Sequence, residues 1–305
     1  MKVTMIGMGA VGAVVGKRLN DFLGRENLQC IAEGSRLERY RNSGITINGE
    51  RIDFNYVTPQ EAHVADLVII ATKNLQLKEV LVQIKNAVGP DTAILSLLNG
   101  IQSESDIAEV YGEEKTLYGY IVNLSSTNER GTITCGHEGT IYFGENDNST
   151  SERVLEIKKL FDDAKVNCVV PEDIHLMQWK KFLLNVSCNT ISALCHQTYK
   201  GFRNEVMQDL VRQCSNEVIQ VANAKGIALT PEMTEDNIRM TAALNDDGKT
   251  SMFQDVEAKR KTENDYFCGT IVDLGKELGI ETPVCALLQQ LIKCVATAFE
   301  LKQNT

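Results

Sequence analysis

Apolar runs alternate with amphipathic segments through the first half of the chain. Nearly continuous apolar runs predict buried strands at 2–6, 29–32, 65–72 and 92–98. Helical periodicity follows the first run to about Leu23 and the third over 76–87. Strands this apolar are covered on both faces, which favours a parallel sheet connected by helices. From 115 to 143 strands alternate with turns at 128–131 and 137–139, which predicts an antiparallel addition at the sheet edge.

The second half of the chain lacks this pattern. After Val169-Val170-Pro171 the strand character ends, and one long helix is predicted from 173 to about 198. Glycine, proline and asparagine then interrupt further helical segments near 225–227, 230–231, 245–248 and 278–280. The fold class is therefore α/β: a parallel-sheet domain over residues 1–170, followed by an all-helical domain over 171–305. The cleft between two such domains is where we expect a substrate to bind.

Composition narrows the classes of partner. A chain of 305 residues exceeds the usual size of one core, which agrees with two domains. Its net charge of −10 opposes a phosphate backbone, so no nucleic-acid partner is expected. No apolar stretch is long enough for a membrane span or a signal peptide, so a cytoplasmic location is expected. The nine scattered cysteines include no C-x-x-C pair, and neither a disulfide framework nor a metal site is expected.

A glycine motif follows the first predicted strand directly and opens a helix. Its residues are Gly7, Met8, Gly9, Ala10, Val11 and Gly12. In this setting the first glycine makes a tight turn, the second lets backbone approach a pyrophosphate, and the third lets helix and strand pack closely. The helix N-terminus attracts the phosphate charge. The first domain is therefore predicted to be a Rossmann-type dinucleotide-binding domain.

Polar residues at the ends of the other predicted strands are further cofactor candidates. Glu33 follows the second strand, where a carboxylate accepts hydrogen bonds from the adenosine ribose and repels a 2′-phosphate. It favours NAD(H) over NADP(H), although Arg36 could offset the repulsion. Lys73 and Asn99 follow the next two strands, at the edge of the sheet where ligands bind, although either could merely cap a helix or form a turn.

A polar stripe marks the first long helix of the second half. Lys181, Asn185, Asn189 and Ser192 recur every three or four residues, which places them on one helical face. The apolar neighbours favour the wall of a polar cleft over an ordinary solvated face. Farther along, Ser251 is expected to be the N-cap of a helix, in a capping box with Gln254.

The chain resembles the ketopantoate reductase family, whose members are 2-dehydropantoate 2-reductases, along nearly its whole length. The matching segments are Gly7–Gly12, Thr72-Lys73, Leu98-Asn99-Gly100, Trp179–Asn185, Ser251–Asp255 and Arg260–Tyr266. The resemblance implies reduction of 2-dehydropantoate to (R)-pantoate by a nicotinamide hydride, on the route to pantothenate and coenzyme A. The expected partner is thus a small 2-oxo acid; the oligomeric state, a homodimer included, stays open.

The resemblance also implies roles for individual residues. Lys181 corresponds to the catalytic lysine and Glu263 lies beside it and the cofactor. The residues expected to contact substrate are Asn185, Asn189 and Ser251. Asn99 approaches the nicotinamide end, with Ser125 as a further candidate nearby.

Three departures from the family pattern keep alternatives open. Glu33 replaces the usual arginine for the 2′-phosphate, although NADP is the family norm. Tyr199 and Gly248 stand where relatives often carry asparagines near the substrate. An NAD-dependent (R)-2-hydroxyacid dehydrogenase acting on other branched 2-oxo acids is therefore the alternative. A non-catalytic dinucleotide sensor is more remote, because Lys181, Asn185 and Glu263 are all present.

Overall fold

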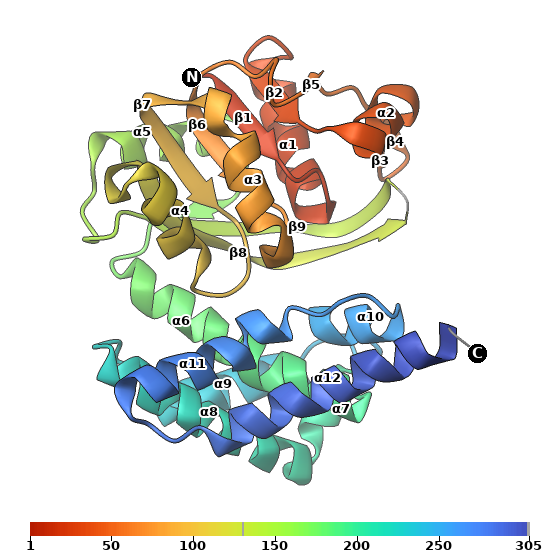
Figure 1. The fold of residues 1–305 in the computed structure, drawn as a ribbon, viewed down its shortest axis with the longest axis vertical. Helices are drawn as coiled ribbons and strands as arrows, with labels where there is room; N and C mark the ends of the chain where they lie inside the picture. The colour runs from red at the N-terminus through yellow and green to blue at the C-terminus, as the bar shows by residue number, and fades with distance from the viewer. Residues whose placement is uncertain (130, 304–305) are drawn as a thin grey trace. The chain divides into compact units, whose positions relative to one another are not determined.

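The computed structural model describes residues 1–129 and 131–303. The chain divides into two compact units (Figure 1). Unit 1 comprises Met1–Asn99 and Ser103–Ile174, and unit 2 comprises Gly100–Gln102 and the chain from His175 onward. Unit 1 contains the sheet, whereas unit 2 is built from helices.

The described part of unit 1 forms a ten-stranded sheet of order β4-β3-β9-β8-β7-β6-β1-β2-β5, with β10 beside β9. Its strands are β1 (Val3–Ile6), β2 (Leu28–Ile31), β3 (Ile45–Ile47), β4 (Glu50–Ile52), β5 (Tyr56–Val57), β6 (Ala65–Ile70), β7 (Val88–Ser96), β8 (Thr116–Glu129), β9 (Thr132–Gly144) and β10 (Cys168–Val169). The strand β1 pairs in parallel with β2 on one side and with β6 on the other. The chain therefore reverses its direction of progress across the sheet at β1. Ligands of such sheets bind at the carboxyl ends of the strands at this point.

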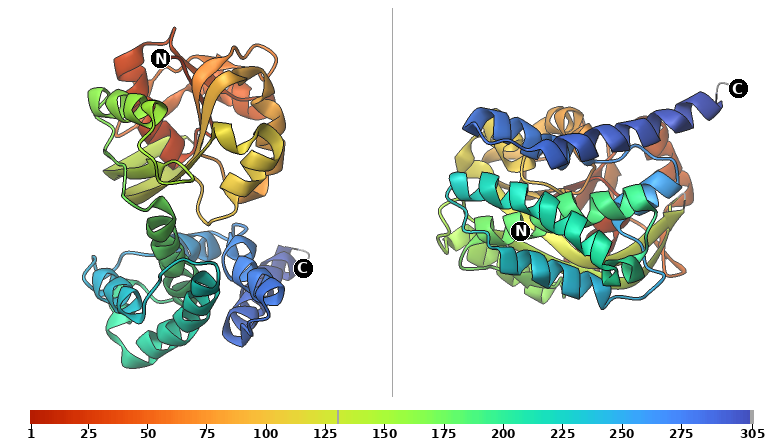
Figure 2. Two further views of the ribbon diagram at one scale, coloured as in Figure 1. Left: turned by 90° about the vertical axis from the view of Figure 1, so that its left-hand side faces the viewer. Right: turned by 90° about the horizontal axis from the view of Figure 1, so that it is seen from below.

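Both faces of the parallel sheet are covered by helices (Figure 2). These are α1 (Ala10–Leu23), α2 (Gly34–Ser43), α3 (Leu77–Gln83), α4 (Ser103–Tyr111) and α5 (Glu152–Asp163), with short 3-10 turns η1 (Asn74–Gln76), η2 (Lys85–Ala87) and η3 (Glu113–Lys115). Met5 and Ile69 pack into one core with α1 and α5, whereas Ile6 and Ile70 pack into another with α3 and α4. Successive residues of a strand point to opposite faces, which explains the continuous apolar runs. The predicted parallel α/β fold is confirmed.

The β8–β9 hairpin is the predicted antiparallel addition, but its details differ from the prediction. It is not the edge of the sheet, because β3 and β4 continue beyond β9. The segment 137–139 is not a turn; it lies within β9, near a register shift opposite Ser125 and Ser126. A bulge of this kind also collects glycine and polar residues, which is why the pattern resembled a turn. The other predicted turn includes Arg130, which lies outside the described residues.

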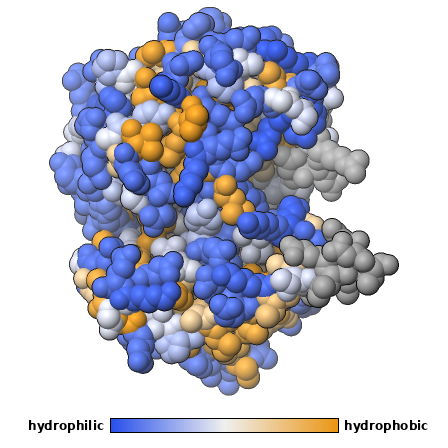
Figure 3. Space-filling view, in the orientation of Figure 1, coloured by the Kyte–Doolittle hydropathy of each residue, from blue (hydrophilic) through white to orange (hydrophobic). Residues whose placement is uncertain are grey.

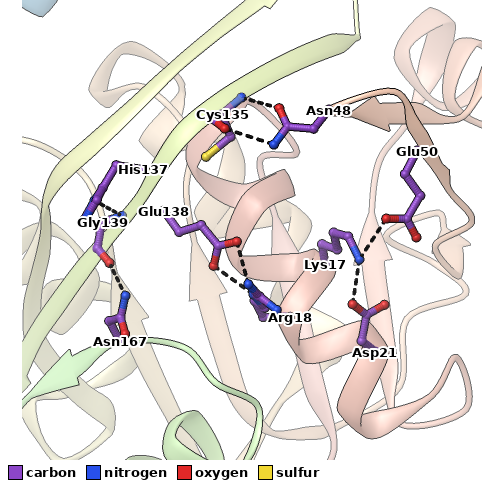
Figure 4. A network of polar contacts seen from close by, with 10 residues as sticks. All are labelled: Lys17, Arg18, Asp21, Asn48, Glu50, Cys135, His137, Glu138, Gly139 and Asn167. Atoms are coloured by element: carbon purple, nitrogen blue, oxygen red, sulfur yellow. Dashed lines mark hydrogen bonds and ion pairs between the residues drawn. The ribbon is translucent and has the colours of Figure 1, made fainter.

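Polar contacts attach β9 to α1 and to the β3–β4 turn (Figure 4). Arg18 donates from Nε and Nη2 to the carboxylate of Glu138, both at 2.8 Å. The Asn48 amide exchanges two hydrogen bonds with the backbone of Cys135. These contacts join segments far apart in sequence, and they give the hairpin its position over α1.

Unit 2 consists of helices, and the predicted breaks near 225–231, 245–248 and 278–280 separate several of them, whereas the break at 258–267 was not predicted. They are α6 (Ile174–Leu184), a π-helical turn η4 (Asn185–Asn189), α7 (Thr190–Cys195), α8 (Glu205–Ala224), α9 (Pro231–Ala242), α10 (Ser251–Glu257), α11 (Cys268–Leu278) and α12 (Pro283–Gln303), with the 3-10 segments η5 (Tyr199–Arg203) and η6 (Asn264–Tyr266). Phe182, Phe202 and Phe267 are among the largest side chains of their common core. Glu217 of α8 accepts hydrogen bonds from the backbone of Val284 and Cys285, at 2.7 and 2.8 Å, and so caps α12.

The single helix predicted from 173 to 198 is wrong in one respect: a π-helical turn interrupts it at Asn185–Asn189. A step of four residues rotates by more than one full turn in an α-helix, whereas in the wider π-helix it rotates by less than one full turn. The π turn therefore offsets the angular drift and keeps Lys181, Asn185 and Asn189 nearly in line. Such turns occur frequently at functional sites.

The face shown in Figure 3 is mostly hydrophilic, with apolar colour in separate spots. Within the described residues, no helix is long and apolar enough to cross a membrane.

Candidate active site

The glycine turn between β1 and α1 has the geometry that its sequence predicts. Gly7 has a φ of +94°, and a Cβ there would lie 2.6 Å from the Ala71 carbonyl carbon. A Cβ on Gly12 would lie 2.1 Å from the Gly7 carbonyl oxygen. At Gly9, by contrast, a Cβ would meet nothing in the described chain within 4 Å. Two of the glycines are thus required by the fold, whereas Gly9 faces open space that a ligand can enter.

A pocket of about 300 Å³ opens beside this turn. It is lined by Ile6, Gly7, Met8, Ile31, Ala32, Glu33, Gly34, Ser35, Arg36, Tyr40, Thr72, Gln76, Glu79, Val80 and Gln83. These residues come from the carboxyl ends of β1, β2 and β6 and from the helices that follow. The pocket therefore lies at the point where Rossmann-type sheets bind ligands.

The polar groups around the pocket suit the adenosine and phosphate groups of a dinucleotide. The N-terminus of α1 has no side-chain cap within the described residues, and its first turn contains no acidic residue. Its backbone N–H groups can therefore receive an anion. The buried hydroxyl oxygen of Thr72, a lining residue, has no hydrogen-bond partner in the described chain. A bound ligand would satisfy both deficits.

The predicted cofactor residues are distributed around and beyond this pocket. Glu33 is exposed at the N-cap of α2 and belongs to the pocket lining. Lys73 is exposed at the N-cap of η1. Asn99 follows β7, and its carbonyl oxygen accepts a hydrogen bond of 2.8 Å from the Asn74 amide. Ser125 lies on β8, paired with His137, and is not part of the pocket lining that the structure describes.

A buried hydrogen-bond chain supports the segment that carries Asn99. The Leu98 N–H donates to Ser96 Oγ at 3.2 Å, and Ser96 Oγ lies 2.8 Å from Ser103 Oγ. Ser103 in turn donates to the carboxylate of Glu104 at 3.0 Å, and Glu104 is fully buried. The chain joins the end of β7 to the start of α4. Sequence analysis missed these residues, because a serine and a glutamate in a first helical turn resemble an ordinary cap.

In unit 2, a hydrogen-bonded network joins all three predicted substrate residues. Asn189 donates from Nδ2 to Asn185 Oδ1 at 3.1 Å and to Ser251 Oγ at 3.3 Å. Asn185 is 4% exposed, and its Nδ2 has no hydrogen-bond partner among the described residues. A buried amide donor without a partner costs about 1–3 kcal/mol, so a ligand acceptor at this position is favoured.

The capping role predicted for Ser251 is wrong. Thr250 is the N-cap of α10, and its side chain accepts a hydrogen bond of 3.3 Å from the Phe253 N–H. Ser251 is the first helical residue, so its hydroxyl bonds Asn189 instead. Two adjacent hydroxyl residues stand where this helix begins, and local sequence does not distinguish which of them adopts the extended N-cap conformation.

The structure places the two predicted catalytic residues within unit 2. Lys181 is half-buried on α6, one α-helical turn before Asn185, and therefore projects from the same face. Glu263 is half-buried at the N-cap of η6, where its carbonyl accepts from the Tyr266 N–H at 2.9 Å. Their catalytic roles stay predictions.

Tyr199 and Gly248, the two departures from the family pattern, are in direct contact. A Cβ on Gly248 would lie 2.5 Å from the ring of Tyr199. The Tyr199 hydroxyl donates to the Lys249 carbonyl at 3.0 Å, and burial raises the pKa of this phenol, which keeps it protonated. The ring at position 199 thus requires glycine at 248, and the pair fixes the segment that leads to Ser251.

Similar proteins identify the family of this chain. Residues 3–148 match the family model of ketopantoate reductase PanE/ApbA, and residues 173–296 match that of its C-terminal domain. A 2-dehydropantoate 2-reductase of Streptococcus pyogenes serotype M3 is 28% identical over 302 residues, covering 96% of this chain and 97% of that protein.

Solved structures agree with this assignment. A 2-dehydropantoate 2-reductase from Geobacter metallireducens has a TM-score of 0.85 at 26% identity, covering 96% of this chain and 99% of its own. A D-mandelate dehydrogenase in a ternary structure with NADH and anilino(oxo)acetate has a TM-score of 0.88 at 23% identity, covering 98% and 100%. The second likeness shows a shared fold. The chain belongs to the ketopantoate reductase PanE/ApbA family of nicotinamide-dependent oxidoreductases.

Proposed function

We propose that the protein reduces 2-dehydropantoate to (R)-pantoate with a nicotinamide cofactor. The observation that carries the proposal is the Asn185–Asn189–Ser251 network, whose buried Asn185 Nδ2 lacks a partner among the described residues. It lies one helical turn from Lys181. These three polar side chains are hydrogen-bonded to one another, but one amide donor among them has no acceptor in the described chain, and a lysine projects from the same helical face. Such a group of donors suits a small ligand with several oxygen atoms. In this assignment residues 1–170 bind the cofactor and residues 171–305 bind the 2-oxo acid.

The proposed chemistry follows from the charges that develop in the reaction. The bound nicotinamide supplies the hydride that reaches the carbonyl carbon. Negative charge then builds on the carbonyl oxygen, where a protonated Lys181 stabilises it and donates a proton from Nζ. Asn185 and Asn189 orient the substrate as neutral donors and acceptors, and Glu263 holds the ammonium in position. Asn99 and Ser125 are proposed to contact the nicotinamide end of the cofactor.

We assign NADH as the preferred cofactor. Glu33 lines the pocket at the N-cap of α2, where a carboxylate accepts hydrogen bonds from ribose hydroxyls and repels a 2′-phosphate. Arg36 also lines the pocket and opposes this preference. Lys73 follows β6, another strand whose carboxyl end borders the pocket, and there it can approach a phosphate.

A second candidate function is supported by the Tyr199–Gly248 pair. A packed aromatic ring against glycine gives the segment before Ser251 a shape different from that of two amide side chains. This favours an (R)-2-hydroxyacid dehydrogenase that acts on other branched 2-oxo acids.

Initial rates decide between the two functions. The purified protein is assayed with 2-dehydropantoate and a panel of branched 2-oxo acids, each with NADH and with NADPH. The proposal expects the largest kcat/KM for 2-dehydropantoate with NADH. A larger kcat/KM for another branched 2-oxo acid would establish the second candidate, and no turnover with any of them would contradict both.

A further inference from the structure

One wall of the cofactor pocket is formed by the end of η1 and by α3. Gln76, Glu79, Val80 and Gln83 line this side of the pocket. Glu79 and Gln83 are four residues apart, so they lie on one face of the helix. Val80 is buried and anchors α3 to the core that it shares with α4. The backbone of α3 is therefore held in place, and its polar side chains extend from a fixed position beside the pocket.

One amide group joins the two walls. Gln83 donates from Nε2 to Glu33 Oε1 at 2.9 Å and to Glu79 Oε1 at 3.2 Å. Since both oxygens bond the same nitrogen, they lie at most about 6 Å apart, a distance at which like charges interact appreciably. Gln83 thus holds two carboxylates close together at the pocket.

The balance of charge there is unfavourable for an additional anion. Among the described residues that line the pocket, the formal charges are those of Glu33, Glu79 and Arg36. A phosphate monoester carries about −1.5 to −2 at neutral pH. A carboxylate that lies about 6 Å from such a phosphate in a solvated site weakens its binding by about tenfold. A ribose hydroxyl, in contrast, donates a hydrogen bond to either carboxylate.

We infer that Glu79, held beside Glu33 by Gln83, is a second determinant of the choice between NADH and NADPH. The inference rests on the proposed nicotinamide cofactor. It adds α3 to the elements that distinguish the adenosine ribose of NADH from the 2′-phosphorylated ribose of NADPH. Glu33 alone is then insufficient to account for the discrimination. Glu79 contributes repulsion of the 2′-phosphate, and Gln83 is a positioning residue for both carboxylates.

Calorimetric titration of the full-length protein with NADH and with NADPH tests this inference without turnover. We expect Glu79→Gln to lower the ratio of NADH to NADPH affinity about tenfold and to change the Kd for NADH by less than twofold. Gln83→Leu lowers the same ratio, because the carboxylates separate. Glu33→Gln lowers the ratio and also weakens NADH, and combination with Glu79→Gln lowers it further.

Glu38→Gln is the matched control, because Glu38 is an exposed carboxylate of α2 outside the described pocket lining. It should leave the ratio unchanged. A ratio for Glu79→Gln within twofold of the parent overturns the inference while leaving the cofactor proposal intact. A parent protein that prefers NADPH also overturns it. If the parent binds neither dinucleotide, the proposed function fails with it.

Discussion

Single side chains in the proposed substrate network have separable roles. Asn185 and Asn189 are buried and bonded to each other, whereas Lys181 is the charged member of the same helical face. Thr250 and Ser251 are adjacent, yet one caps a helix and the other bonds Asn189. Because the roles differ, a substitution at one residue should change catalysis and a substitution at the other should change stability.

Replacement of Lys181 by alanine should lower kcat by about 10²–10⁴, the usual contribution of a positioned proton donor. Dinucleotide affinity should stay the same, because the cofactor pocket lies in unit 1. The matched control is Lys180→Ala, which removes the neighbouring lysine that pairs with Asp236 at 3.9 Å. Steady-state kinetics of both variants provide the comparison. Turnover of Lys181→Ala within threefold of the parent would rule out the proposed role.

Replacement of Thr250 by alanine should lower the free energy of unfolding by about 1 kcal/mol, because the N-cap of α10 is lost. Ser251→Ala should leave stability nearly unchanged and raise KM for the oxo acid. Urea denaturation and steady-state kinetics measure the two quantities. If Ser251→Ala instead destabilised the protein as much as Thr250→Ala, with KM unchanged, its role in substrate binding would be refuted.

At the scale of elements, helix ends in unit 2 depend on residues distant in sequence. The N-terminus of α12 is capped by Glu217 from α8, a residue more than sixty positions away in the sequence. The helical segments themselves could be predicted from periodicity and from breaks at glycine and proline. The π turn could not, because it depends on how Asn185–Asn189 pack within the core rather than on local propensity.

Replacement of Glu217 by leucine should lower the free energy of unfolding by about 1–3 kcal/mol, because two backbone N–H groups of α12 lose their acceptor. Glu232→Gln is the control, since this exposed glutamate lies in the first turn of α9. Chemical denaturation followed by circular dichroism measures both. Equal stability of the two variants would show that water replaces the carboxylate without cost.

At the scale of the whole molecule, binding of the cofactor is linked to stability. NADH at about one hundred times its Kd should stabilise the folded protein by about 2.7 kcal/mol and raise the Tm. Gly9→Ala should keep a Tm close to that of the parent, because a Cβ there meets nothing in the described chain, but it should lose most of the shift. Gly12→Ala should lower the Tm itself, because a Cβ there would lie 2.1 Å from the Gly7 carbonyl oxygen. Thermal unfolding with and without NADH measures these effects; a full shift in Gly9→Ala would contradict the placement of the pyrophosphate.

The sequence by itself determined four strands of the parallel sheet, the change to helices after residue 170, the glycine turn and the residue types of the polar stripe. These features depend on periodicity, glycine conformation and spacing along one chain segment, which are local properties. Tertiary structure alone decided the pairing of β9 with β3, the contact of Tyr199 with Gly248, the opposition of Glu33 and Glu79, and the choice of Thr250 as the cap. Each of these arises where segments distant in sequence meet or where two adjacent residues are locally equivalent. Packing therefore selects among arrangements that local physics leaves nearly equal in energy.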